Sequence, residues 1–162
     1  MKKFLSVFLT ILMAICCLTP SYAFAAGNSE FDSEFTQQEF ESLEHTYAVS
    51  IQPYSSRLIT SHRLGIAKNS NNLVISGFTQ GNDEVIKCGF TKVVIQKRAS
   101  SSASWSNYKT FNDLYSESTY YKLSKSVPVE SGYQYRVTAI HYAKKSLFST
   151  QKIDATTGYL QF

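Results

Sequence analysis

The chain has 162 residues, of which 43% are hydrophobic and 17% are charged, and its formal net charge is +4. This length accommodates one ordinary domain with an attached segment, and it is enough to bury a hydrophobic core without covalent cross-links. Of the three cysteines, Cys16 and Cys17 lie in an N-terminal apolar segment, which leaves Cys88 in the rest of the chain. A single cysteine excludes an intramolecular disulfide, so packing must stabilise the fold.

Residues 1–25 have the pattern of a secretory signal peptide. Two lysines give a positively charged start, and the apolar run that follows is too short for a transmembrane anchor. Ala23 and Ala25 supply the small residues that precede a cleavage site. We therefore expect a secreted protein whose mature chain begins near Ala26 and has no transmembrane segment.

Residues 26–56 form an acidic leader with six acidic and no basic side chains, whereas residues 57–162 contain 14 basic and six acidic side chains. The formal charges of the two parts are therefore −6 and +8. Apolar residues at roughly helical spacing between Glu34 and Glu44 permit a marginal amphipathic helix, but we expect this leader to be disordered. A linker, a pro-segment and a mask that weakens the attraction of the basic domain to anionic surfaces all fit this charge split.

Short segments with β-strand patterns recur about every dozen residues through 57–162. The clearest alternation lies in 132–142, where Tyr135 and Val137 face one way and polar residues face the other. Lys125 interrupts the apolar face of another segment, which predicts a strand near a sheet edge. The pattern predicts an all-β, two-sheet antiparallel β-sandwich. The seven predicted strands are 57–67, 72–78, 90–98, 105–111, 119–129, 132–142 and 149–155, with 159–162 beyond them.

Two stretches of this domain resemble a fibronectin type III domain. The stretch VESGYQYRV at 129–137 is similar to the turn into the sixth strand of that fold. The resemblance implies that Tyr135 is a tyrosine corner, whose ring packs in the core and whose hydroxyl bonds to backbone near Val129. The stretches VVIQ at 93–96 and WSNY at 105–108 resemble the third strand and the edge strand that follows it. The resemblance implies a fibronectin type III or immunoglobulin-like sandwich of about seven strands.

The whole chain is also similar to small secreted proteins of unknown function from Gram-positive bacteria. Those proteins share a signal peptide, a short leader and one β domain with a Gly-Tyr-x-Tyr-Arg-Val-like stretch, which here is 132–137. The resemblance implies secretion and no particular activity.

No segment carries a recognisable catalytic or metal-binding motif. Cys88 and His141 could be imagined as a nucleophile and its base, but nothing near Cys88 predicts a helix start that would activate a thiolate. Asp113 and Glu117 flank a loop, as pairs of carboxylates do in most proteins. We therefore expect a non-enzymatic protein with no catalytic, cofactor-binding or metal-binding residues.

Aromatic side chains are the one group that exceeds what a core needs. Trp105, Tyr108 and Tyr142 are candidate ligand contacts, because exposed rings beside Lys and Arg can stack on sugars or anchor a protein partner. Scattered surface tyrosines are also normal on β-sheets, so both interpretations stay open.

The leading hypothesis is a secreted, non-enzymatic and monomeric binding module, either released or associated with the cell surface or wall. Its expected partner is an anionic cell-wall polymer, a glycan or a surface protein, whereas nucleic acid is a poor match for an exported chain. Two alternatives stay open: a small wall-acting hydrolase or hydrolase inhibitor, and a small outer-membrane β-barrel, which the C-terminal Phe162 permits.

Overall fold

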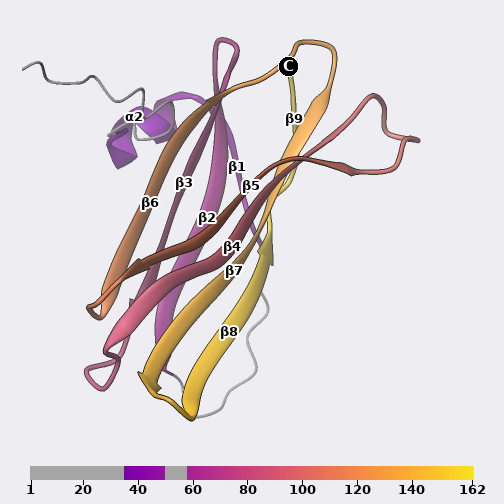
Figure 1. Cartoon of the computed structure of the whole chain (residues 1–162). Coiled ribbons are helices and arrows are strands. Elements are labelled where there is room, and N and C mark those ends of the chain that lie inside the picture. Colours follow the sequence, from indigo (N-terminus) through magenta and orange to yellow (C-terminus); the bar gives the residue numbers. More distant parts are fainter. Residues whose placement is uncertain (1–34, 50–57) are drawn as a thin grey trace, which may run out of the picture.

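The computed structural model describes residues 35–49 and 58–162, so the predicted signal peptide lies outside the described residues. Within them, two antiparallel sheets enclose a hydrophobic core, and the chain is a β-sandwich (Figure 1). The strands are β1 (Glu44–Tyr47), β2 (Ile59–Asn69), β3 (Asn72–Gly81), β4 (Lys87–Arg98), β5 (Ser106–Ser116), β6 (Tyr120–Pro128), β7 (Gln134–Ser146), β8 (Ser149–Thr156) and β9 (Leu160–Gln161).

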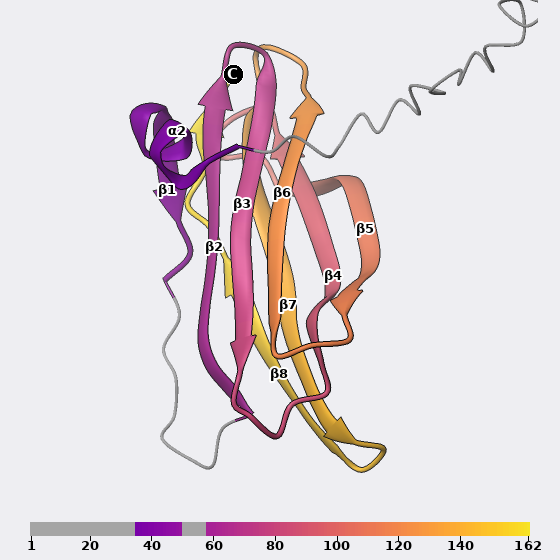
Figure 2. The same ribbon diagram turned by 90° about the vertical axis from the view of Figure 1, so that its left-hand side faces the viewer.

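The two sheets have different strand orders. The four-stranded sheet has the order β1-β2-β3-β6, and the five-stranded sheet has the order β5-β4-β7-β8, with β9 paired to β7. The strands from β2 to β8 correspond to the seven that the sequence predicts. β6 ends one sheet and β5 ends the other, which confirms the edge positions expected for both (Figure 2).

Every second side chain of β7 points into the space between the sheets. Tyr135, Val137, Ala139, His141 and Ala143 are buried, and the residues between them are partly exposed. This confirms the predicted alternation. It also places the polar side chains of β7 on the outer face of the five-stranded sheet.

Tyr135 joins the turn between β6 and β7 to the core. Its ring is fully buried, with ring centroids of Tyr108 and Phe162 at 5.6 and 5.4 Å. Its hydroxyl accepts the backbone N–H of Glu130 at 3.1 Å and donates to the Glu130 carbonyl at 3.2 Å. Glu130 directly follows the buried Val129, so the hydroxyl meets backbone within the turn where the sequence places this contact.

The expectation that residues 26–56 are a disordered leader is wrong for residues 35–49. Helix α2 (Gln37–Ser42) begins at a capping box in which the Thr36 hydroxyl accepts the Glu39 N–H. The Glu39 carboxylate in turn accepts the Thr36 N–H at 2.8 Å. Two N–H groups that would otherwise lack partners are thereby satisfied, and the short helix is fixed at its start.

Tertiary packing explains why this segment is ordered. Phe40 of α2 is 0% exposed and packs against Ala67 and Val74, on the outer face of the four-stranded sheet. The next residues form β1, which extends that sheet by pairing with β2. The sandwich therefore includes residues before the expected boundary at residue 57, because Phe40 finds partners that are distant in the sequence.

Candidate functional site

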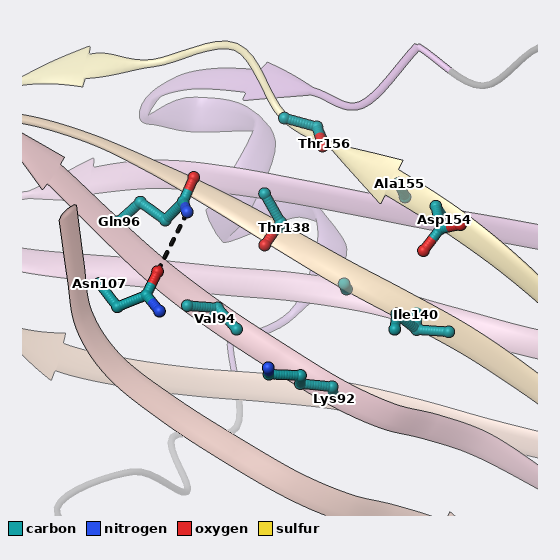
Figure 3. Close-up of a pocket in the computed structure, with 10 residues that line it drawn as sticks. Lys92, Val94, Gln96, Asn107, Thr138, Ile140, Asp154, Ala155 and Thr156 are labelled. Atoms are coloured by element: carbon teal, nitrogen blue, oxygen red, sulfur yellow. Dashed lines mark hydrogen bonds between the residues drawn. The ribbon is translucent and has the colours of Figure 1, made fainter. Parts of the chain in front are cut away.

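The outer face of the five-stranded sheet carries a hollow of about 310 Å³ (Figure 3). Val94 of β4 pairs with Thr138 of β7, which pairs in turn with Thr156 of β8. Beside this row, the side-chain amide of Gln96 donates to Oδ1 of Asn107 across β4 and β5 at 3.1 Å. The floor of the hollow is therefore lined with hydroxyl and amide groups that can exchange hydrogen bonds with a ligand.

The neighbouring row of the same hollow adds charge. Lys92 of β4 pairs with Ile140 of β7, which pairs with Asp154 of β8. A cation and a carboxylate thus lie on opposite sides of a partly exposed isoleucine.

Trp105 lies at one end of this face with two arginines over its ring. The guanidinium carbons of Arg98 and Arg136 are 4.3 and 4.4 Å from the ring centroid. Neutral amide oxygens orient both groups, because Arg98 Nε donates to Gln134 at 2.7 Å and Arg136 Nε donates to Gln96 at 2.9 Å. Among the described residues, neither guanidinium forms an ion pair with a carboxylate.

Two guanidiniums over one ring favour an anion. Burial, followed by the charge of Arg98, lowers the pKa of Arg136 from its ordinary value. An anionic group beside them would offset both effects, and a phosphate or carboxylate matches the fork of donors that a guanidinium presents.

Tyr142 lies toward the other end of the face, against Tyr115, with ring centroids 5.3 Å apart. Both residues pair with Gly89 of β4 from opposite sides, so their rings meet over a residue without a side chain. A Cβ on Gly89 would lie 2.0 Å from the Leu114 carbonyl oxygen, which leaves no room for another residue. Burial and a hydrogen bond to Asp113 raise the pKa of Tyr115 to about 12, so its phenol is neutral.

The outer face as a whole is basic. Two of its carboxylates are engaged, since Glu117 pairs with Lys87 at 2.7 Å and Asp113 accepts the Tyr115 hydroxyl at 3.1 Å. Asp113 and Glu117 therefore each contact a different partner. The charged groups of this face are Lys87, Lys92, Arg98, Arg136, Lys144, Lys152, Asp113, Glu117 and Asp154.

The acidic residues that the structure describes in the leader do not cover this basic face. Glu39 and Glu41 lie on α2, and Glu44 begins β1, so all three belong to the other sheet. Glu41 accepts the Tyr47 hydroxyl at 2.6 Å. The expected mask is therefore not made by these three carboxylates.

The structure separates the three aromatic candidates. Trp105 and Tyr142 lie on the outer face, whereas Tyr108 packs against the core beside Tyr135 and donates its hydroxyl to the Pro128 carbonyl at 3.2 Å. Tyr108 therefore lies apart from the other two candidates, and its ring and hydroxyl take part in packing.

The sequence analysis did not identify the polar groups that line the hollow as part of one site. Alternation identifies them one strand at a time, but no local pattern states which strands are neighbours or in which register. The missed residues are Lys92, Gln96, Asn107, Thr138, Asp154 and Thr156.

Cys88 and His141 contact Thr79 in a buried cluster between the sheets. Nδ1 of His141 lies 2.8 Å from the Thr79 hydroxyl, and the Cys88 thiol donates to the Thr79 carbonyl at 3.4 Å. Burial raises the pKa of Cys88, so the group is a neutral thiol rather than a nucleophilic thiolate. The cluster is built for packing between β3, β4 and β7.

No protein-family model, curated protein or solved structure matches this chain. Within residues 35–49 and 58–162, no helix has both the length and the apolar character to cross a membrane. The same residues contain no group of three or more His, Cys, Asp or Glu side chains placed to hold a metal ion.

Proposed function

We propose that this protein is an exported, non-enzymatic binding module, and that the outer face of its five-stranded sheet binds an anionic cell-surface or wall polymer. The signal-like pattern of residues 1–25 supports export. The single observation that carries the anionic ligand is the cluster of Arg98, Trp105 and Arg136, in which two guanidiniums share one ring and are oriented by neutral amides.

The spacing of the cations favours a polymer over a small anion. Lys87 and Arg98 are the two ends of β4, and a strand of this length extends roughly 35–40 Å at about 3.3 Å per residue. A small anion would touch one end of this face. A chain of repeated anionic units would contact cations along its whole length.

The floor of the hollow supports a polymer with hydroxyl groups. Gln96, Asn107, Thr138 and Thr156 offer amides and hydroxyls between the two charged ends, and such groups exchange hydrogen bonds with the hydroxyls of a sugar or polyol. An acidic glycan or a polyol phosphate combines the charge, the hydroxyl groups and the length that this face accommodates.

Binding of the purified protein to immobilised polymers tests this proposal. Poly(glycerol phosphate) and polygalacturonate supply repeated phosphates and carboxylates, and dextran is the neutral control. We expect binding to both polyanions at low ionic strength and little binding to dextran. The affinity should fall as ionic strength passes about 0.15 M, where the screening length is about 8 Å.

Single substitutions locate the site. Arg98→Gln and Arg136→Gln should each weaken polyanion binding about tenfold, since a hydrogen bond to a charged group contributes about 1.5–3 kcal/mol. Arg98→Lys should lose less, because it keeps the charge but not the planar fork. Lys122→Gln is the matched control, since Lys122 is exposed on the outer face of the four-stranded sheet. Equal losses for Arg98→Gln and Lys122→Gln, or equally tight binding to dextran, would refute the proposal.

A further inference from the structure

The turn between β7 and β8 carries two large apolar side chains in water. Leu147 is 80% exposed and Phe148 is 98% exposed, and they connect Ser146 and Ser149, which pair with each other. Figures 1 and 2 show this hairpin at the end of the sandwich farthest from the C-terminus, where it projects as a narrow tip.

Neither residue is required by the backbone of the turn. Among the described residues, positive φ angles occur at Ser70, Asp113, Gly89 and Gly132, so Leu147 and Phe148 both have ordinary negative values. Polar residues therefore fit the same turn and would keep it soluble. Since folding does not explain the pair, its exposure points to a partner.

The surroundings of the tip combine a third apolar residue with lysines. Ile86 is 55% exposed, and its N–H donates to the Lys144 carbonyl at 2.9 Å, which places it beside the hairpin. Lys144 and Lys145 precede the turn, and Lys152 follows it on β8. The acidic groups nearby are Asp83, Glu84 and Glu117, of which Glu84 pairs with Lys145 and Glu117 pairs with Lys87.

We propose that this tip, formed by Ile86, Leu147 and Phe148, inserts into the interface of a lipid bilayer that contains anionic phospholipids. The three side chains expose on the order of a few hundred Å², whereas each partner in a stable protein interface buries about 800 Å². A projecting apolar tip also needs no matching pocket in a bilayer. Lysines beside the tip can extend toward anionic head groups while the apolar side chains enter the acyl boundary.

Vesicle flotation with the purified protein tests this docking surface. Vesicles of phosphatidylcholine alone are compared with vesicles that also contain phosphatidylglycerol. We expect binding to the anionic vesicles, and we expect the double substitution Leu147→Ser with Phe148→Ser to lower the partition coefficient by about tenfold or more, since burying each side chain is favourable. Val49→Ser is the matched control, because Val49 is an 88% exposed apolar residue outside the tip.

A second readout separates insertion from adsorption by charge. Phe148→Trp should gain a blue-shifted emission and quenching by brominated acyl chains on anionic vesicles, whereas the native Trp105, at the other end of the sheet, should not. Absence of vesicle binding, or equal binding of the double serine variant and the wild type, would overturn the proposal. Loss of a dimer in the serine variant without any vesicle binding would overturn it in favour of a second copy of this chain. Binding of polyanionic polymers by the serine variant should stay intact, so failure of this inference is distinct from failure of the proposed function.

Discussion

Mild acid should destabilise this protein through one buried imidazole. His141 is fully buried, and its Nδ1 lies 2.8 Å from the Thr79 hydroxyl. That hydroxyl donates its single proton to the Gly89 carbonyl at 2.9 Å, so the hydrogen-bond network assigns Nδ1 as the donor to Thr79. Nε2 is then the unprotonated nitrogen, and the described residues give it no hydrogen-bond partner.

The energetic consequence follows from proton linkage. Burial, together with the charge of His62 at a ring distance of 4.6 Å, lowers the pKa of His141 from 6.5 to about 3. In the unfolded chain the imidazole gains a proton below about pH 6.5, whereas the folded protein gains it only near pH 3. Stability contributed by neutral His141 is therefore present above pH 6.5 and lost as pH falls, at about 1.4 kcal/mol per pH unit. Between pH 7 and pH 5 the loss is about 2 kcal/mol.

Urea unfolding followed by far-UV circular dichroism at several values between pH 7 and pH 5 measures this loss. His141→Phe removes the titrating group and leaves the Thr79 donation to Gly89 intact, so its stability should change much less over the same range. Burial also lowers the pKa of His62, so His62 adds to the pH dependence of stability. His62→Asn should lose that part and keep most of the slope, which comes from His141. Wild-type stability that is flat between pH 7 and pH 5, or a His141→Phe variant with the wild-type slope, would refute the reasoning.

Two further predictions concern stability. Tyr135→Phe should lower the free energy of unfolding by about 1–3 kcal/mol, because it leaves the Glu130 N–H without its partner. Tyr133→Phe is the control. Equal urea midpoints for the wild type and Tyr135→Phe would contradict the role of Tyr135 as a structural anchor. Phe40→Ala should lower the free energy of unfolding by about 3–5 kcal/mol, since Phe40 is fully buried on Ala67 and Val74. Gln38→Ala, on the exposed side of the same helix, is the control. Thermal unfolding of both variants distinguishes a helix that is part of the folded domain from a dispensable leader.

The sandwich itself was predictable because its strands carry their own signal. In β7 the buried residues at 135, 137 and 139 alternate with the polar, partly exposed residues at 134, 136 and 138. A period of two is therefore visible without any knowledge of the neighbouring strands. The edge position of β6 was also predictable from its own sequence, through Lys125. A charge on the inward side is tolerated at a sheet edge, and β6 is an edge strand.

The segment 35–49 shows what local patterns leave out. The pair Thr36 and Glu39 has the spacing of a capping box and could have strengthened the prediction of a helix. The stability of a six-residue helix still comes from its tertiary contacts. Those contacts are Ala67 and Val74, about thirty residues away in the chain, and no local pattern indicates them.

The candidate site was less predictable because it depends on register. Gln96 meets Asn107, and Val94 meets Thr138, only after bulges between Ile95 and Gln96 and between Phe90 and Lys92 have set the pairing. β5 has polar residues on both faces, so its sequence could not show that Tyr108 faces the core.

The Trp105 cluster and the hairpin tip lie at opposite ends of one sheet. β4 and β7 run antiparallel, so Arg98 lies opposite Gln134 at one end, and Lys87 lies opposite Lys144, near the hairpin tip, at the other. If the tip enters a bilayer, the strands of this sheet lead away from the membrane (Figure 1). The outer face of the sheet then stays exposed to solvent. A polymer can then lie along that face with one end near the lipid head groups. Insertion of the tip therefore leaves the Trp105 cluster accessible, since this cluster is roughly the full length of β4 away from the tip.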